Sequence, residues 1–127
     1  EETAEITAIF NSFGKSEIVP EHLMDAVTAV SGSSPAYVYM MIEAMADAAV
    51  VEGMPRPQAY KFAAQAVLGS AQMVLETGKH PGELKDMVCS PGGTTIAAVA
   101  KLEETGFRSS IMQSMKACAD KSREMSK

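Results

Sequence analysis

The chain has 127 residues, of which 46% are hydrophobic and 21% are charged, so it can form one domain with a core but not two. A net charge of -5, with lysines and arginines scattered along the chain, argues against a surface that binds nucleic acid. The acidic start carries no signal-peptide pattern, and Cys89 and Cys118 lie outside any metal-ligand spacing, which favours a cytoplasmic protein with reduced thiols.

The first 20 residues predict a helix and then a strand. Residues 2–13 have apolar side chains at helical spacing, which predicts an amphipathic helix that Gly14 ends. Residues 15–19 alternate as in a short strand, which Pro20 ends. Because one strand cannot form a sheet, we expect it to pair with a segment outside the chain or to lie as an extended linker. This pattern indicates the latter part of a longer protein.

From residue 21 onward the sequence predicts helices. Residues 21–30 form the first, and a break rich in serine and glycine follows. Pro35 suits the first turn of the next helix, with Ser33 or Ser34 as its cap. That helix reaches residue 51 and is apolar nearly all round. Two acidic residues interrupt its apolar run, which is therefore too short for a membrane span. In so small a domain, this composition favours burial against a second subunit over the core of a monomeric bundle.

Four more helices are predicted over residues 55–77, 80–87, 95–104 and 107–126, with glycines at 78 and 106 as stop signals. His80 precedes a proline and is interpreted as a residue that starts a helix. No cysteine or second histidine lies three or four residues away from it, so we expect no metal site.

The segment at residues 90–95 reads Ser-Pro-Gly-Gly-Thr-Thr and is the most informative in the chain. Its glycines let the backbone approach a ligand, and a threonine can cap the helix that follows. The first turn of that helix offers free N–H groups and the positive end of a dipole, which suit a small anion. No lysine follows the glycines, so a carboxylate fits better than a nucleotide phosphate. Taken alone, the segment is equally well explained as a tight connection between helices.

Together, these segments resemble the pyrroline-5-carboxylate reductase family. The similarity covers essentially the whole chain, follows bacterial members closely and is carried by residues 25–37, 53–56, 80–96 and 102–108. Ser34 stands where many members carry glycine. The family begins with a dinucleotide-binding domain opened by a Gly-x-Gly-x-x-Gly turn, and this sequence has no such turn.

The resemblance implies an all-α fold in which a helical bundle interleaves with a second subunit as a dimerisation domain. Residues 1–20 would be the end of the cofactor-binding domain, as a helix plus a strand, or a linker. Residues 21–127 would form the helical dimerisation and substrate-binding domain. The expected assembly is a homodimer, with higher oligomers left open, and neither nucleic acid nor membrane is an expected partner.

The resemblance also implies the reaction and its site. A hydride from NADPH or NADH, bound mainly by the absent domain, would reduce the C=N carbon of 1-pyrroline-5-carboxylate to give L-proline. The carboxylate would be held by the Ser90 hydroxyl and the N–H groups of Gly93 and Thr94, and the Thr95 hydroxyl would bond the ring nitrogen, with Met87 beside the pocket. The implied assignments are substrate binding by Val88, Ser90, Gly92, Gly93, Thr94 and Thr95, catalysis by Thr95, and cofactor binding by Thr28 and Ser33.

Two other classes of protein compete with this interpretation. One is a stand-alone helical dimerisation or interaction module without catalysis, which has no reason to keep the glycine turn. The other is the helical domain of another hydroxyacid or amino-acid dehydrogenase, but the catalytic lysine motif of that class is missing around Lys61, Lys79 and Lys85. If the chain is part of a reductase, we expect it to be inactive alone, because it lacks the dinucleotide-binding domain.

Overall fold

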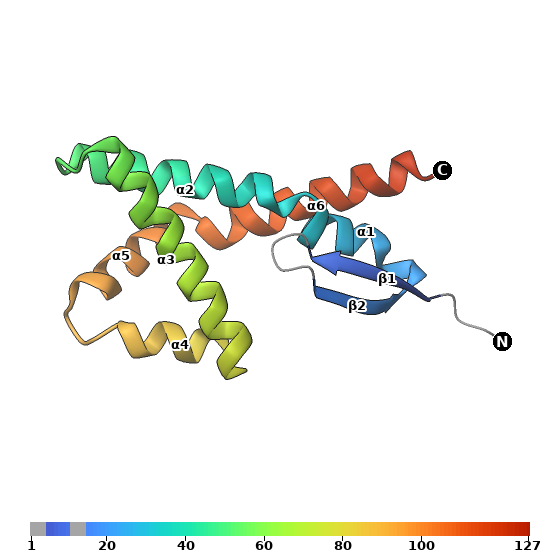
Figure 1. Cartoon of the computed structure of the whole chain (residues 1–127), viewed down its shortest axis with the longest axis horizontal. Helices are drawn as coiled ribbons and strands as arrows, with labels where there is room; N and C mark the ends of the chain where they lie inside the picture. The colour runs from blue at the N-terminus through green and yellow to red at the C-terminus, as the bar shows by residue number, and fades with distance from the viewer. Residues whose placement is uncertain (1–4, 11–14) are drawn as a thin grey trace. The chain divides into compact units, whose positions relative to one another are not determined.

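The computed structural model describes residues 5–10 and 15–127, with side chains from Ile18 onward. Two strands come first and helices follow (Figure 1). The chain divides into two units. The first contains the described residues up to Val38 together with Phe107–Lys127, and the second is Tyr39–Gly106.

The first unit opens with a β-hairpin. Strands β1 (Glu5–Phe10) and β2 (Lys15–Pro20) pair antiparallel, and every residue of each strand has a partner in the other. The strand predicted at residues 15–19 is confirmed and extends by one residue. Its partner lies within the chain, so the expectation of an external partner or a linker is wrong.

The helix predicted over residues 2–13 is wrong at residues 5–10, and the rest of that prediction lies outside the described residues. Three of the six residues in β1 are β-branched: Ile6, Thr7 and Ile9. Branching at Cβ restricts the side chain in a helix and suits a pleated strand. This local preference outweighs the helical spacing of the apolar residues.

The helical part begins with three short turns of different pitch. They are η1 (Glu21–Leu23), a 3₁₀ turn, then α1 (Met24–Val27) and η2 (Thr28–Gly32), a π-helical turn. The π turn closes through a hydrogen bond of 2.8 Å from the Ser33 N–H to the Thr28 carbonyl oxygen. The predicted break is therefore a widened helical turn that leads into the next helix.

Helix α2 (Ser34–Val51) begins directly after Ser33 and has Pro35 in its first turn, as predicted. It ends two residues before Gly53, also as predicted. The Ala36 N–H donates to the main-chain carbonyl of Ser33 at 3.1 Å, so the backbone of this serine helps to close the first turn.

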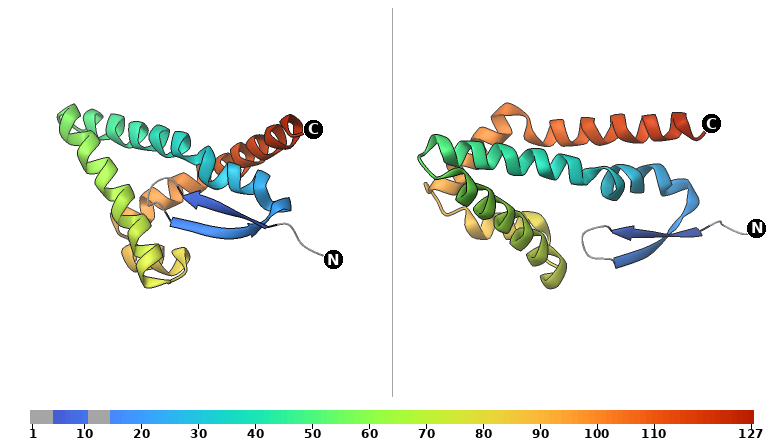
Figure 2. Two further views of the ribbon diagram at one scale, coloured as in Figure 1. Left: turned by 45° about the vertical axis from the view of Figure 1, so that its right-hand side comes forward. Right: turned by 45° about the horizontal axis from the view of Figure 1, so that its top comes forward.

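Helix α6 (Phe107–Met125) packs against α1 and η2 within the first unit (Figure 2). The Ser122 hydroxyl donates to Oδ1 of Asp25 at 2.7 Å, and Nε of Arg123 lies 3.9 Å from the other carboxylate oxygen. Ala29, in η2, is 2% exposed. These contacts connect the two ends of the helical sequence, which lie almost a hundred residues apart.

The second unit continues through α3 (Arg56–Thr77), α4 (Pro81–Val88) and α5 (Thr94–Thr105), which confirms three predicted helices within one or two residues. Gly78 and Gly106 end α3 and α5 in the left-handed conformation expected of helix stops.

Two local contacts fix the starts of helices in this unit. Nη1 of Arg56 pairs with Oδ1 of Asp47 at 2.7 Å and the guanidinium lies over the Tyr60 ring, so α3 is attached to α2 at its first residue. The hydrogen bond with Asp47 raises the pKa of Arg56. At the next helix, Nδ1 of His80 accepts the Gly82 N–H at 2.9 Å, which confirms its role as a helix-start residue.

Burial within one chain is small. Among the side chains of residues 18–127, the only buried ones belong to four alanines: Ala29, Ala46, Ala59 and Ala63. Helix α2, expected to be buried on most sides, leaves Tyr39 66% and Met40 68% exposed. A single chain therefore supplies little of the cover that this apolar helix was predicted to have. No helix in the described part of the chain has the length and hydropathy needed to cross a bilayer.

Candidate functional site

The glycine-rich segment forms a tight turn between α4 and α5. The Gly93 N–H donates to the Ser90 carbonyl oxygen at 3.0 Å, and Gly92 has φ +70°. Proline in the second position and a left-handed glycine in the third are the pattern of a type II turn. The turn reverses the chain directly in front of α5.

The N-terminus of α5 has no side-chain cap. Gly93 is the N-cap residue, and Thr94 and Thr95 are the first two residues of the helix, so the prediction that a threonine caps it is wrong. The first main-chain bond runs from the Ala97 N–H to the Gly93 carbonyl oxygen at 3.4 Å. Within the described residues, the N–H groups of residues 94–96 have no protein acceptor. Such a helix end is suited to an anion.

Ser90 and Gly93 fit closely together. A Cβ placed on Gly93 would lie 2.6 Å from Oγ of Ser90 and 3.2 Å from its carbonyl oxygen. The first distance is shorter than real Cβ contacts and the second is tight, so a side chain at position 93 would have to displace the Ser90 hydroxyl from the start of α5. The turn thereby brings one hydroxyl and a row of free N–H groups together.

The predicted substrate-binding side chains are open to solvent on a single chain. Ser90, Thr94 and Thr95 are exposed, and Val88 and Met87 are each 63% exposed. The predicted hydrogen bond from the Gly93 N–H to the substrate carboxylate is not available in this structure, because that N–H already donates to the Ser90 carbonyl oxygen. The N–H donors left near Ser90 are those of Thr94, Thr95 and the residue that follows them.

Thr28 and Ser33, the predicted cofactor residues, lie at the two ends of the π turn and are half-buried. The Ser33 hydroxyl oxygen accepts a hydrogen bond from the Cys118 thiol at 3.2 Å. These residues belong to the first unit, whereas the glycine turn belongs to the second. The structure therefore brings Thr28 and Ser33 together, and Ser90 together with the start of α5, as two separate groups.

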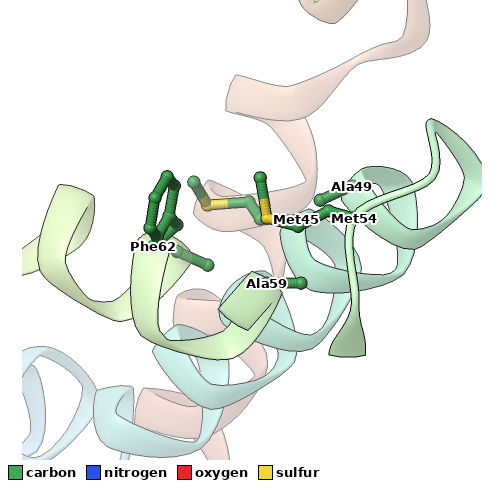
Figure 3. A pocket seen from close by; sticks show the side chains of 6 residues that line it. Met45, Ala49, Met54, Ala59 and Phe62 are labelled. Atoms are coloured by element: carbon green, nitrogen blue, oxygen red, sulfur yellow. The ribbon is translucent and has the colours of Figure 1, made fainter. Parts of the chain in front are cut away.

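A shallow apolar hollow of about 180 Å³ lies in the second unit, between α2 and α3 (Figure 3). The sequence predicted the apolar face of α3 but not this hollow, since it also needs side chains from α2 and the connection between the helices. No residue of the glycine turn lines it. Its lining residues are Met45, Ala49, Met54, Ala59, Phe62 and Ala63.

Over the described ranges, no group of three or more histidine, cysteine, aspartate or glutamate side chains could hold a metal ion. The polar groups at the two candidate sites are hydroxyls and main-chain N–H groups. These groups bind and orient a ligand by hydrogen bonds, and a reaction that takes place there depends on a reagent carried by the ligand.

Comparisons with known proteins identify the type of domain. A family model described as pyrroline-5-carboxylate reductase dimerisation matches residues 21–125. The pyrroline-5-carboxylate reductase of Escherichia coli K12 is 65% identical over the whole chain, which covers 47% of that protein. The reductase of Arabidopsis thaliana is 51% identical over 99% of the chain and 46% of its own length. The chain thus spans about half the length of the curated relatives it matches.

Solved structures give the same result. The pyrroline carboxylate reductase of Plasmodium falciparum with NADP bound is similar at a TM-score of 0.82 and 37% identity, over 86% of this chain and 44% of that one. The 1-pyrroline-5-carboxylate reductase of Streptococcus pyogenes is similar at a TM-score of 0.81 and 39% identity, over 84% and 41%. The fold is that of a reductase dimerisation domain. The chain belongs to the pyrroline-5-carboxylate reductase family.

Proposed function

We propose that this chain is the dimerising, substrate-binding part of an enzyme that reduces 1-pyrroline-5-carboxylate to L-proline with NADPH or NADH. The observation that carries the proposal is the Ser90 hydroxyl beside the uncapped start of α5, with Gly93 leaving the space between them open. This arrangement is rich in hydrogen-bond donors, which suit a small carboxylate. The alternative, a helical module without catalysis, leaves the close fit of Ser90 and Gly93 unexplained.

In the proposed site, the carboxylate accepts hydrogen bonds from the Ser90 hydroxyl and from the N–H groups of Thr94 and Thr95. Gly92 sets the turn, and Val88 borders the ring of the substrate. The Thr95 hydroxyl, on the first turn of α5, bonds the ring nitrogen and holds the C=N bond in one orientation. In a hydride transfer the protein mainly has to position the substrate, because the nucleotide carries the reactive group.

The nicotinamide nucleotide, when bound, supplies the hydride. The residues proposed to meet its nicotinamide end, Thr28 and Ser33, fit that role in one respect. Since the Ser33 oxygen accepts from Cys118, its own proton remains available for an acceptor on a ligand. A neighbour of this fold was solved with NADP bound, which supports a nicotinamide cofactor for the family.

The proposed assembly is a homodimer, in which a second copy covers apolar side chains that one chain leaves exposed, Tyr39 and Met40 among them. Both the name of the matching family model and the absence of large buried side chains among residues 18–127 support it. The cytoplasmic location inferred from the cysteines stays a prediction.

A chimera tests the proposal. The matched region is the C-terminal part of the E. coli reductase, so the preceding part of that protein is joined to this chain. We expect oxidation of NAD(P)H that depends on 1-pyrroline-5-carboxylate. In the same chimera, Thr95→Ala should lower kcat about 10–100-fold at unchanged thermal stability, the loss expected for one hydrogen bond to a charged group.

The control is Thr105→Ala at the other end of α5, where the hydroxyl donates to main-chain carbonyls of its own helix. This variant should keep full kcat. A chimera that folds, dimerises and binds NAD(P)H but forms no proline would contradict the proposed function.

A further inference from the structure

The side chains of Ser33, Tyr37 and Cys118 form a cluster in the first unit, and the proposed chemistry gives Tyr37 and Cys118 no role. Ser33 comes at the end of the π turn, Tyr37 lies one helical turn later in α2, and Cys118 reaches them from α6. All three side chains are half-buried. The Cys118 thiol donates to Oγ of Ser33 at 3.2 Å, a normal distance for a bond that involves sulfur.

The hydrogen bond between Cys118 and Ser33 has a defined direction from donor to acceptor. Hydrogen bonding with Cys118 is the main cause that raises the pKa of Tyr37, and burial adds to it. The thiol proton is directed to Ser33. A hydroxyl has one proton and two lone pairs, so a serine that accepts from the thiol directs its own proton away from α6. Donor chains of this kind strengthen one another in partly buried surroundings.

The backbone of Ser33 is also fixed. Its N–H bonds the Thr28 carbonyl oxygen at 2.8 Å across the π turn, and its carbonyl accepts the Ala36 N–H at 3.1 Å. Backbone and side chain are thus held by bonds to η2, α2 and α6 together. Such a serine offers a ligand one donor in one orientation, at little further cost in side-chain entropy.

We propose that Cys118 is a positioning residue, which orients the Ser33 hydroxyl as a hydrogen-bond donor to the nicotinamide carboxamide oxygen of NAD(P)H. The inference rests on the proposed function and adds to it a residue on α6 that does not touch the cofactor. It predicts that nucleotide affinity depends on a donor at position 118, whichever atom carries that donor.

The test measures the Kd of NADPH for the chimeric reductase from the fluorescence of the nucleotide. Ser33→Ala and Cys118→Ala should each raise Kd about 3–10-fold, as the loss of one neutral hydrogen bond predicts. Cys118→Ser restores the donor and should bring Kd back to within about twofold of the parent. The Ser33→Ala, Cys118→Ala double variant should bind no worse than Ser33→Ala alone, because both changes remove the same interaction.

Ser122→Ala is the matched control. Ser122 lies one turn beyond Cys118 on α6 and donates to Asp25, so its loss should lower the melting temperature without a change in Kd. Should Cys118→Ala fail to fold, Cys118→Val, which fills the space but lacks a donor, gives the same comparison with Cys118→Ser.

The outcomes separate the inference from the proposed function. If Ser33→Ala weakens binding and Cys118→Ala does not, or if Cys118→Ser binds as poorly as Cys118→Ala, the positioning role is wrong and the reductase activity stands. If Ser33→Ala leaves Kd unchanged, Ser33 does not contact the nucleotide and the inference fails with it. Failure of the proposed function would appear elsewhere, as a parent chimera that binds NADPH and leaves 1-pyrroline-5-carboxylate unreduced.

Discussion

Gly93 occupies the one position of the turn where a side chain would collide with the rest of the proposed site. Its missing Cβ leaves the space that Oγ of Ser90 approaches. Gly92 is glycine for a different reason. Its φ of +70° disfavours other residues, yet a Cβ there would meet no atom within 4 Å. Two adjacent glycines therefore serve two separate requirements, one steric and one conformational.

This difference leads to a first prediction. Gly93→Ala should displace the Ser90 hydroxyl and raise the KM for 1-pyrroline-5-carboxylate at least tenfold in the chimera. Gly92→Ala carries only the cost of a left-handed alanine, about 1 kcal/mol of stability, and should change KM less. Steady-state kinetics and thermal unfolding of both variants give the comparison. Equal effects on KM would contradict the close fit of Ser90 and Gly93.

A second prediction concerns pH. Because the neutral form of Tyr37 is favoured in the folded state, its pKa lies above the ordinary value of about 10. Its contribution to stability is complete below that ordinary value and is lost as the pH rises through the folded pKa. In an ultraviolet titration of phenolate, the ionisation phase that is lost in Tyr37→Phe should shift to lower pH in Cys118→Ala. Tyr39→Phe should leave this phase in place.

Helix α4 is the shortest helix of the second unit, with eight residues, and it depends on its cap. Nδ1 of His80 accepts the Gly82 N–H, one of the donors that the first turn leaves free. His80→Ala should lower the free energy of unfolding by about 0.5–2 kcal/mol, whereas His80→Asn, which keeps an acceptor, should lower it less. Urea denaturation monitored by circular dichroism measures both changes. Identical midpoints for alanine and asparagine would contradict a capping role for His80.

The sequence predicted helices α3 to α6 closely, because glycine and proline mark their ends and these signals act locally. Errors arose where two local preferences competed. In β1 the helical spacing of apolar residues lost to β-branching, and at α5 a glycine took the cap position that a threonine was expected to hold. The π turn carried no sequence signal, since it differs from an α turn only in which carbonyl each N–H selects.

The site was predictable in part for a similar reason. Residues 90–95 are contiguous, so the turn and the uncapped helix follow from local sequence. The contact between Ser33 and Cys118 joins residues 85 positions apart and needed the packing of α6 on η2. The same holds for the apolar hollow, which draws on α2 and α3 together.

For the molecule as a whole, we predict self-association. The 127-residue chain should elute and scatter light as a particle of at least twice the mass of one chain, and its thermal stability should rise with concentration. Met40→Lys, on an exposed apolar position of α2, should shift the equilibrium toward the monomer. Ile18→Lys is the control, because Ile18 is equally exposed but lies outside the residues that the family model matches. A monomer at all concentrations would contradict the proposed assembly.

The four buried alanines also bear on calorimetry. Unfolding usually raises the heat capacity by roughly 12–15 cal/mol/K per residue, since water must hydrate newly exposed apolar surface. Within residues 18–127, the groups fully hidden inside one chain are methyls, and the larger apolar side chains are only partly covered. Unfolding of a single chain should therefore expose less new apolar surface than unfolding of an assembly in which a second copy covers these side chains, and its increment should be smaller. The slope of unfolding enthalpy against melting temperature would thus report how much surface the subunits cover in each other.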